Sequence, residues 1–320
     1  MGNLLLTAVV ALGAGVVATP IAALVARRVG AVDHPGPLKP QASAVPYLGG
    51  VAVMVALGAG LAGGRAVAAV PLVAAVVLGT LDDLVGMPIV VRVLGQASIG
   101  VGIALAIPWR LSGAAGMIVG GLVAVVLMNG VNLLDGLDAL SAGVVAVGCA
   151  FLAILLHGPG RSLAVALACG LAAFLVFNRP PARIYLGDGG TYLLGASATM
   201  LLAYAWAPAL SAATGIATLA VVAIPCAEVA LAVVRRVRMH APMTEGDRRH
   251  PYDLLAARGW PVGAVALAYA AGEAAVGAVA VAAAKAGDDW AVAALVAIAT
   301  LLLVLGSATG AMSPRVGAGV

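Results

Sequence analysis

Residues 3–26 read NLLLTAVVALGAGVVATPIAALVA and are followed directly by Arg27 and Arg28. The run carries no charge and, at about 1.5 Å per helical residue, it is long enough to cross a hydrocarbon core about 30 Å thick. The basic residues follow the run, whereas in a secretory signal peptide they precede it. This stretch therefore predicts a first membrane helix whose N-terminus lies outside.

The rest of the chain repeats this pattern. Hydrophobic residues make up 63% of it, charged residues 9%, and the mean hydropathy is +1.12, whereas an average soluble domain is about 25% charged. We expect an all-α, polytopic bundle of ten or eleven transmembrane helices in one domain, residues 1–320. The predicted spans are 3–26, 47–64, 66–81, 93–108, 113–130, 140–157, 162–178, 191–207, 212–234, 262–284 and 290–308.

The basic residues indicate the orientation of this bundle. Thirteen of the 17 lysines and arginines fall in segments that are cytoplasmic if the N-terminus is outside, in agreement with the positive-inside rule. They lie between apolar runs and form no block with interleaved aromatic residues, which argues against a nucleic-acid partner. We expect a multi-pass protein of the cell membrane with membrane lipid around it.

Most of the acidic residues fall at this same cytoplasmic face. Asp82 and Asp83 end the third apolar run directly. Two adjacent carboxylates at a membrane boundary repel each other and are costly to desolvate, so a divalent cation or a nearby donor is the natural compensation. An ordinary solvated helix end is the alternative interpretation of this pair.

A second polar cluster follows the fifth run, where Asn129, Asn132, Asp135 and Asp138 recur every three residues. On a helix this spacing places them along one ridge. Amide and carboxylate oxygens suit hard cations, ribose hydroxyls and base edges. The alternative is a capped helix end followed by a loop.

Two further segments at this face combine small or basic residues with an acid. Gly187 and Gly189 flank Asp188 and leave backbone amides free to bind phosphate oxygens, although such a segment by itself is usually a turn. Near residue 250, arginine forks and one histidine suit a diphosphate. By contrast, we attribute Arg235, Arg236 and Arg238 to topology and anionic lipid alone.

Taken together, these segments resemble the polyprenyl-phosphate N-acetylhexosamine-1-phosphate transferases. The resemblance favours the bacterial undecaprenyl-phosphate GlcNAc-1-phosphate transferase branch over the MurNAc-pentapeptide translocase branch. One motif departs from the family, because His250 is followed by Pro251-Tyr252-Asp253 where that branch has a further pair of histidines. The matching motifs are Lys39…Pro46-x-x-Gly49-Gly50, Asp82-Asp83-x-x-Gly86, Asn129-x-x-Asn132-x-x-Asp135-Gly136-x-Asp138 and Asn178-x-x-Pro181-Ala182-x-x-x-x-Gly187-Asp188-x-Gly190.

The resemblance implies an enzyme, a Mg²⁺-dependent phosphoglycosyl transferase, with Mn²⁺ as the alternative ion. A membrane polyprenyl phosphate of the C50–C55 class would attack the β-phosphorus of a UDP-N-acetylhexosamine, most simply UDP-GlcNAc. The products would be UMP and a polyprenyl-diphosphate sugar that initiates a bacterial cell-envelope glycan. A homodimer is left open.

The resemblance also implies roles for single residues. Asp188 would bind the metal and Asp83 would support it, while Asp82 would orient or deprotonate the lipid phosphate. Asp135 would act beside the diphosphate, and His250 would meet the diphosphate or the sugar. The implied substrate-binding residues are Lys39, Asn129, Asn132, Asp138, Asn178, Arg248 and Arg249.

Two other interpretations remain open at this point. The loss of the second and third histidines is compatible with a catalytically silent relative. Glu228 and Glu273, which lie inside predicted spans, would suit a transporter. Transporters place such charges near the bilayer midplane, often within repeats, whereas the polar clusters here lie at span ends and no repeat is evident.

Overall fold

The computed structural model describes residues 4–36, 43–61, 69–242 and 247–312. In these ranges the chain forms thirteen α-helices and one short hairpin of β1 (Val32–Asp33) and β2 (Val45–Pro46), in which Val32 pairs with Pro46. The helices are α1 (Leu4–Val29), α2 (Gly49–Leu61), α3 (Ala69–Val85), α4 (Ile89–Ala106), α5 (Gly113–Leu134), α6 (Leu140–Leu155), α7 (Gly158–Asn178), α8 (Gly187–Ala205), α9 (Ala212–Val221), α10 (Ala223–Met239), α11 (Pro251–Ala257), α12 (Val262–Ala286) and α13 (Asp288–Ala308).

Each predicted apolar run corresponds to helix in this structure, which confirms the all-α membrane class. The ninth run differs, because it is divided into α9 and α10 with a bend of 57° between them. Pro225 in the first turn of α10 has no backbone N–H, so it cannot donate to the carbonyl of Val221, the last residue of α9. The sequence prediction treated this run as one straight span.

Fewer helices than expected satisfy the length and composition of a membrane span. Six of the described helices are long and apolar enough to cross a bilayer, or seven if α9 and α10 form one bent span. Two others among the described helices, α2 and α6, are shorter apolar helices. The structure therefore supports a multi-pass membrane protein, without reaching the predicted count of eleven spans.

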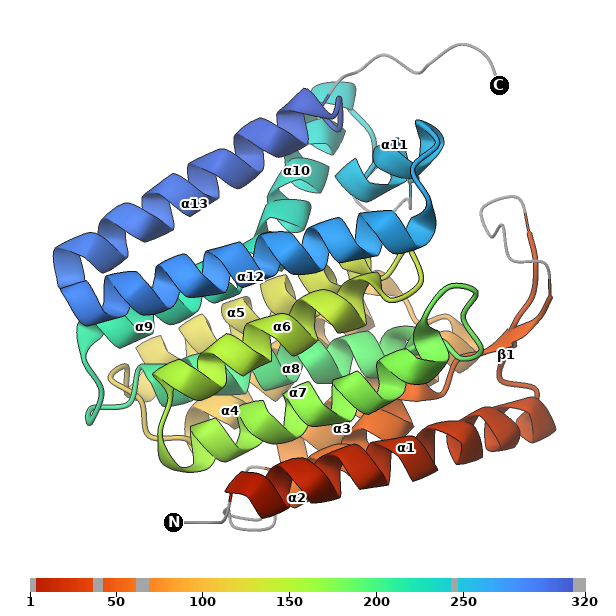
Figure 1. The fold of residues 1–320 in the computed structure, drawn as a ribbon, viewed down its shortest axis with the longest axis horizontal. Coiled ribbons are helices and arrows are strands. Elements are labelled where there is room, and N and C mark those ends of the chain that lie inside the picture. Colours follow the sequence, from red (N-terminus) through yellow and green to blue (C-terminus); the bar gives the residue numbers. More distant parts are fainter. Residues whose placement is uncertain (1–3, 37–42, 62–68, 243–246, 313–320) are drawn as a thin grey trace.

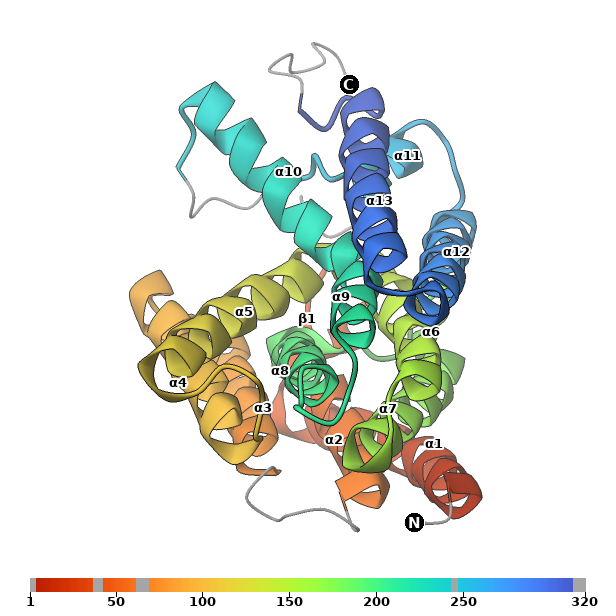
Figure 2. The ribbon, with the colours of Figure 1, turned by 90° about the vertical axis from the view of Figure 1, so that its left-hand side faces the viewer.

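Helix α8 lies at the centre of the bundle, and Figure 2 shows it surrounded by α2, α3, α5, α7 and α9. Glycines of the neighbouring helices α2 and α3 allow this close packing. A Cβ on Gly79 of α3 would lie 2.2 Å from the carbonyl oxygen of Asp188, and one on Gly50 would lie 2.3 Å from the backbone nitrogen of Gly190. Because only glycine fits at these two positions, the ends of α2 and α3 lie directly against the first turn of α8.

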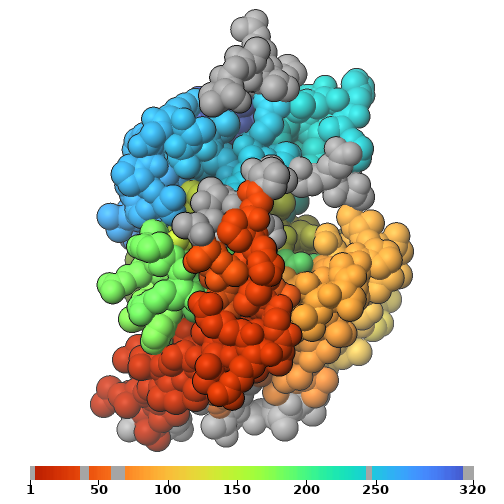
Figure 3. All heavy atoms as spheres, turned by 90° about the vertical axis from the view of Figure 1, so that its right-hand side faces the viewer, coloured from red at the N-terminus to blue at the C-terminus, as the bar shows by residue number. Residues whose placement is uncertain are grey.

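One end of the bundle collects the polar segments. Figure 1 shows the last turns of α3, α5 and α7 and the first turns of α2 and α8 at the same end as the β1–β2 hairpin. Residues 247–253, which comprise a loop and the first residues of α11 and are called the 247–253 loop below, lie above this end. Figure 3 views this end directly, with the hairpin region at its centre between the α3–α4 corner and the end of α7. We call it the polar end.

Candidate functional site

The first group of predicted residues lies where α3 meets the start of α8. Asp82 is buried there, and its carboxylate accepts a hydrogen bond from the Tyr192 hydroxyl at 2.8 Å and from the Met87 backbone N–H at 2.9 Å. The Arg92 guanidinium lies 3.3 Å from the same carboxylate. Asp82 is thus held by three donors of the protein, and Arg92 supplies the compensating charge that the sequence pattern called for.

Asp83 faces the N-terminus of α8. Its carboxylate accepts from the backbone N–H of Gly189 at 3.3 Å, and a Cβ on Gly187 would lie 2.7 Å from the same oxygen. Gly187 has φ +68°, a left-handed conformation that glycine adopts without strain. The positive end of the α8 dipole therefore meets the carboxylate of Asp83.

Asn132 brings α5 to the same place. Its side-chain amide donates to the Asp188 carboxylate at 2.5 Å and to the Thr191 hydroxyl at 3.1 Å. Asp82 lies close enough to Asp188 for the negative charges of the two carboxylates to act on each other. The structure thus unites Asp82, Asp83, Asn132 and Asp188 from three helices in one cluster, which we call the acidic corner.

Asp135 and Asp138 lie in the turn that follows α5. Asp135 accepts a hydrogen bond from the Ser141 hydroxyl, and Asp138 accepts one from the backbone N–H of Ala182 at 2.9 Å. Burial raises the pKa of Asp135, the Ser141 bond opposes this, and the charges of nearby aspartates add to it, giving about 8. Burial likewise raises the pKa of Asp138. We call residues 135–138 the acidic turn.

Two predicted substrate-binding asparagines brace the structure. Asn129 donates to Gln96 of α4 at 2.7 Å and to the Val125 carbonyl at 2.8 Å, which ties α5 to α4. Asn178 is buried; it accepts from the backbone N–H of Ala139 and donates to the Ile184 carbonyl, both at 2.9 Å. Asn178 therefore positions the residue after the acidic turn and the segment before α8, whereas Asn129 holds α5 against α4.

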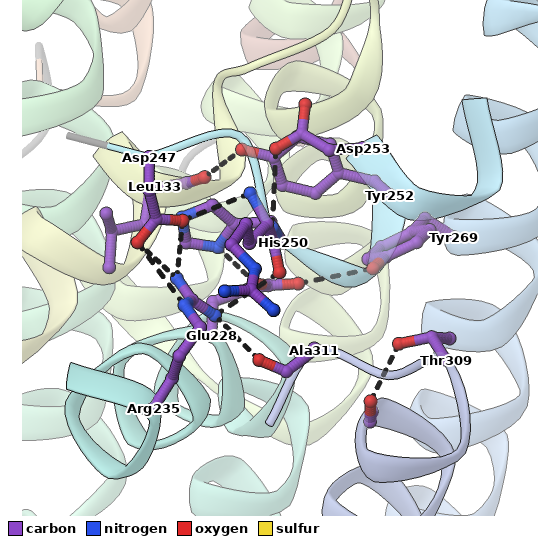
Figure 4. A network of polar contacts seen from close by, with 12 residues as sticks. Leu133, Glu228, Arg235, Asp247, His250, Tyr252, Asp253, Tyr269, Thr309 and Ala311 are labelled. Atoms are coloured by element: carbon purple, nitrogen blue, oxygen red, sulfur yellow. Dashed lines mark hydrogen bonds and ion pairs between the residues drawn. The ribbon is translucent and has the colours of Figure 1, made fainter. Parts of the chain in front are cut away.

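His250 lies in the 247–253 loop and is 3% exposed. Its Nδ1 is 2.8 Å from the Glu228 carboxylate of α10, and its ring stacks on Tyr252 with 5.3 Å between ring centroids. The Tyr252 hydroxyl in turn donates to the Leu133 carbonyl at 2.5 Å, next to the acidic turn. Figure 4 shows this network, which joins the loop to both α5 and α10.

The two predicted arginines of this loop have different surroundings. The Arg248 guanidinium is 3.2 Å from the Asp253 carboxylate and donates to the Gly136 carbonyl at 3.4 Å, so it lies beside the acidic turn. The Arg249 guanidinium contacts the sulfur of Met239 at the end of α10. The structure therefore associates Arg248 with the site and Arg249 with the outer end of α10. Lys39 lies outside the described residues.

The interpretation of Arg235 as a topology signal is wrong. Its side chain is 1% exposed, forms a bidentate pair with Asp247 at 2.7 and 2.8 Å, and donates to the carbonyls of Arg249 and Ala311 at 3.2 Å (Figure 4). This arginine fixes the 247–253 loop and the segment after α13 to α10. The sequence held a signal for this, because Arg235 lies seven residues after Glu228 and therefore on the same helical face.

Sequence reasoning also missed Arg92, Tyr192 and Tyr185. Tyr192 lies one helical turn after Asp188 on α8, a spacing that places both on one face. Burial raises the pKa of Tyr185 to about 12, and the negative charges of Asp138, Asp33 and Asp135 add to this. Tyr185 therefore stands among the acids of the polar end.

Comparison with known proteins is consistent with this geometry. A family model described as glycosyl transferase family 4 matches residues 66–206, the segment that supplies the acidic corner and the acidic turn. The chain is 28% identical over 264 residues to a probable undecaprenyl-phosphate N-acetylglucosaminyl 1-phosphate transferase of Bacillus subtilis, which covers 75% of this chain and 74% of the relative. Residues 66–206 thus match glycosyl transferase family 4, and the longer alignment supports the family that the sequence motifs indicate.

Two further relatives refine this comparison. An undecaprenyl-phosphate alpha-N-acetylglucosaminyl 1-phosphate transferase of Yersinia pestis is 25% identical over 75% of this chain and 73% of its own length. A phospho-N-acetylmuramoyl-pentapeptide-transferase of Moorella thermoacetica is 46% identical, but only over 80 residues, which are 24% of this chain and 25% of that protein. The long alignments confirm the predicted resemblance to the N-acetylglucosaminyl branch.

Proposed function

We propose that this membrane glycosyl transferase transfers N-acetylhexosamine 1-phosphate, GlcNAc-1-phosphate first, from a UDP-sugar to a membrane polyprenyl phosphate. UMP and a polyprenyl-diphosphate sugar are the products. The observation that carries the proposal is the acidic corner, in which α3, α5 and α8 bring three carboxylates and an amide together at one end of an apolar bundle. A soluble nucleotide and a membrane lipid can meet there.

The donor set of the acidic corner suits Mg²⁺. Among the described residues, no three or more histidine, cysteine or acidic side chains are grouped so that they could enclose a metal ion. Mg²⁺ does not need such an enclosure, since it usually keeps several waters and binds through one or two carboxylates together with substrate phosphates. Asp188 and Asp83 would hold the ion, which when bound neutralises charge on the diphosphate.

The protein residues around the corner have distinct roles in this proposal. The polyprenyl phosphate is already ionised at neutral pH and needs no general base to attack phosphorus. Asp82 therefore acts electrostatically, by holding Arg92 and Tyr192 in place. Arg92, whose side chain is 31% exposed, is the cation that would draw the lipid phosphate toward the corner.

The donor nucleotide is assigned to the acidic turn. Asn132, Asp135 and Asp138 would bind the nucleoside and diphosphate, with Arg248 beside Gly136 as the cation on this side. A carboxyl whose pKa lies near 8, such as Asp135, is protonated at neutral pH and can donate a hydrogen bond to a phosphate oxygen. His250 would meet the diphosphate at the nitrogen that Glu228 leaves free.

The test is direct. Purified protein is incubated with Mg²⁺, a C55 polyprenyl phosphate and a panel of UDP-N-acetylhexosamines, and released UMP is measured with and without the lipid. Lipid-dependent release from one donor supports the proposal, and no release from any donor would make the chain a silent relative. Full activity in Asp188→Asn would contradict the metal assignment.

A further inference from the structure

Glu228, which is buried against His250, has no role of its own in the function proposed above. Both side chains are 3% exposed, and Glu228 Oε2 lies 2.8 Å from His250 Nδ1. Glu228 sits in the second turn of α10, directly after the bend that follows α9. A carboxylate at this depth is costly to desolvate unless it is fully bonded.

Glu228 is bonded through both oxygens. Oε1 accepts from the Tyr269 hydroxyl of α12 at 3.2 Å while Oε2 meets the histidine. Figure 4 shows the three side chains reaching one another from α10, α12 and the 247–253 loop. The carboxylate therefore has a fixed direction that two transmembrane helices set.

His250 is restrained on three sides. Glu228 holds Nδ1, Tyr252 covers one face of the ring, and the backbone N–H of His250 donates to Asp253 at 3.3 Å. A carboxylate on Nδ1 favours the tautomer with the proton on that nitrogen, which leaves the Nε2 lone pair as an acceptor; Nε2 donates to a phosphate only when the ring carries both protons. Tyr252 also anchors this arrangement to the Leu133 carbonyl, one residue before the end of α5.

We propose that Glu228 is a positioning residue for the transfer reaction, and that with Tyr269 it fixes the tautomer and direction of the His250 imidazole. This inference rests on the proposed function. It gives the C-terminal third of the chain, outside the segment matched by the family model, a defined part in the reaction. Glu228 itself touches no substrate.

The chain offers a matched control in Glu273, the other glutamate buried within a helix. Glu273 is 0% exposed in α12, and neither of its carboxylate oxygens has a hydrogen-bond partner in the part of the chain that the structure describes. Glu228→Gln and Glu273→Gln make the same chemical change in buried helical sites. Only Glu228→Gln removes the carboxylate that contacts His250.

The experiment compares these variants as full-length purified protein. We expect kcat for lipid-dependent UMP release to fall about 10- to 100-fold in Glu228→Gln, as for other carboxylates that orient a functional histidine, with KM for both substrates within twofold of wild type. Glu273→Gln keeps the wild-type kcat. Adding Glu228→Gln to His250→Asn causes no further loss, because both changes remove one unit.

A spectroscopic measurement separates positioning from general damage. The chain contains four histidines, so ¹⁵N-histidine spectra are simple, and the His250 signals are assigned as those lost in His250→Asn. We expect Glu228→Gln to shift the His250 ring nitrogens away from the Nδ1-protonated pattern, whereas Glu273→Gln leaves them unchanged. Tyr269→Phe, which removes no charge, should lower kcat by a smaller factor in the same direction and serves if Glu228→Gln folds poorly.

The outcomes are distinct. Wild-type kcat in both Glu228→Gln and Tyr269→Phe, or unchanged His250 signals in Glu228→Gln, would overturn the positioning role while leaving the proposed function standing. Additive losses in the double variant would also overturn it. If the wild type releases no lipid-dependent UMP, the proposed function fails and the positioning role fails with it.

Discussion

Removal of the Arg235 guanidinium should destabilise this protein more than removal of any exposed arginine. In Arg235→Met the methionine side chain takes the place of the apolar part of the arginine. Asp247, however, loses its bidentate partner, and the carbonyls of Arg249 and Ala311 lose their hydrogen-bond donor. Breaking a buried pair from one side costs about 3–5 kcal/mol. The Asp247 side chain is 25% exposed and can be rehydrated, so we expect the lower end, about 3 kcal/mol.

The assay is thermal unfolding in detergent between pH 6 and 8, with exposed Arg238→Met as the matched control. Burial of Asp247 raises its pKa, but the hydrogen bonds and charge of Arg235 outweigh this and the net pKa is lowered. A lowered pKa means that the contribution is complete above the ordinary value of 3.8 and is lost as the pH falls through the lower folded value. We expect Tm to fall by roughly 5–10 °C in Arg235→Met and to stay within 1–2 °C, a shift typical of about 0.5 kcal/mol, in Arg238→Met. Equal Tm values for the two variants would refute the reasoning.

Three further predictions concern the pH response, the acidic turn and the buried acid of α12. The pKa of Asp135 in the folded protein is raised to about 8, so ionisation of this carboxyl opposes folding. Its contribution to stability is complete below about pH 4 and is lost as the pH rises toward 8. Asp135→Asn should therefore flatten a profile of Tm against pH from pH 5 to 8, and an unchanged slope would contradict the raised pKa. Gly136→Ala places a Cβ 2.4 Å from the Tyr252 hydroxyl and should lower the free energy of unfolding, measured by chemical denaturation, by about 1–3 kcal/mol. Its control is Gly143→Ala, in open space within α6, which should be neutral or stabilising by up to about 1 kcal/mol. Equal effects of the two substitutions would show that the Tyr252 contact is not tight. Glu273→Met removes a buried carboxyl that has no partner among the described residues and should raise stability by about 1–3 kcal/mol; a lower Tm would show that the carboxyl is satisfied in the native protein.

The helices were predictable because a helix surrounded by lipid or by protein core needs a long run of apolar residues. Such a run can be recognised from neighbouring residues in the sequence alone. The sequence shows Pro225, but the break between α9 and α10 after Val221 was not predicted from it. Proline early in a helix can either start it or bend it, and only packing against the neighbours decides between these. The packing of Gly130 on the Pro225 carbonyl, where a Cβ would lie 2.5 Å away, is such a contact.

The acidic residues of the candidate site were easier to predict than the residues that form hydrogen bonds and ion pairs with them. Asp82, Asp83 and Asp188 were recognised because charge at a membrane boundary is costly and therefore informative. Arg92 and Tyr192, which hold Asp82, were missed because an arginine or tyrosine near a span end is common and says nothing of its partner. Asn178 shows the converse, since its amide was assigned to a ligand and the structure engages it with two backbone groups.

The structure explains the residues Tyr252 and Asp253, which stand after His250 where the resembled family has a further pair of histidines. Tyr252 stacks on the imidazole and anchors it to α5, and Asp253 pairs with Arg248 and accepts from the His250 backbone. The Tyr252–Leu133 contact joins residues 119 positions apart in the chain, which no local pattern reveals. The residues that replace the family's histidine pair are therefore integral to the loop in this protein.

The central claim is that the acidic corner serves the transfer of a phosphosugar to a lipid. Mass spectrometry of the polyprenyl phosphate after incubation with protein, Mg²⁺ and UDP-GlcNAc tests it most directly. We expect the lipid to gain the mass of one N-acetylhexosamine phosphate with wild-type protein and to gain nothing with Asp188→Asn. A lipid of unchanged mass with the wild type and every UDP-N-acetylhexosamine donor, or equal product from the Asp188→Asn variant, would contradict it.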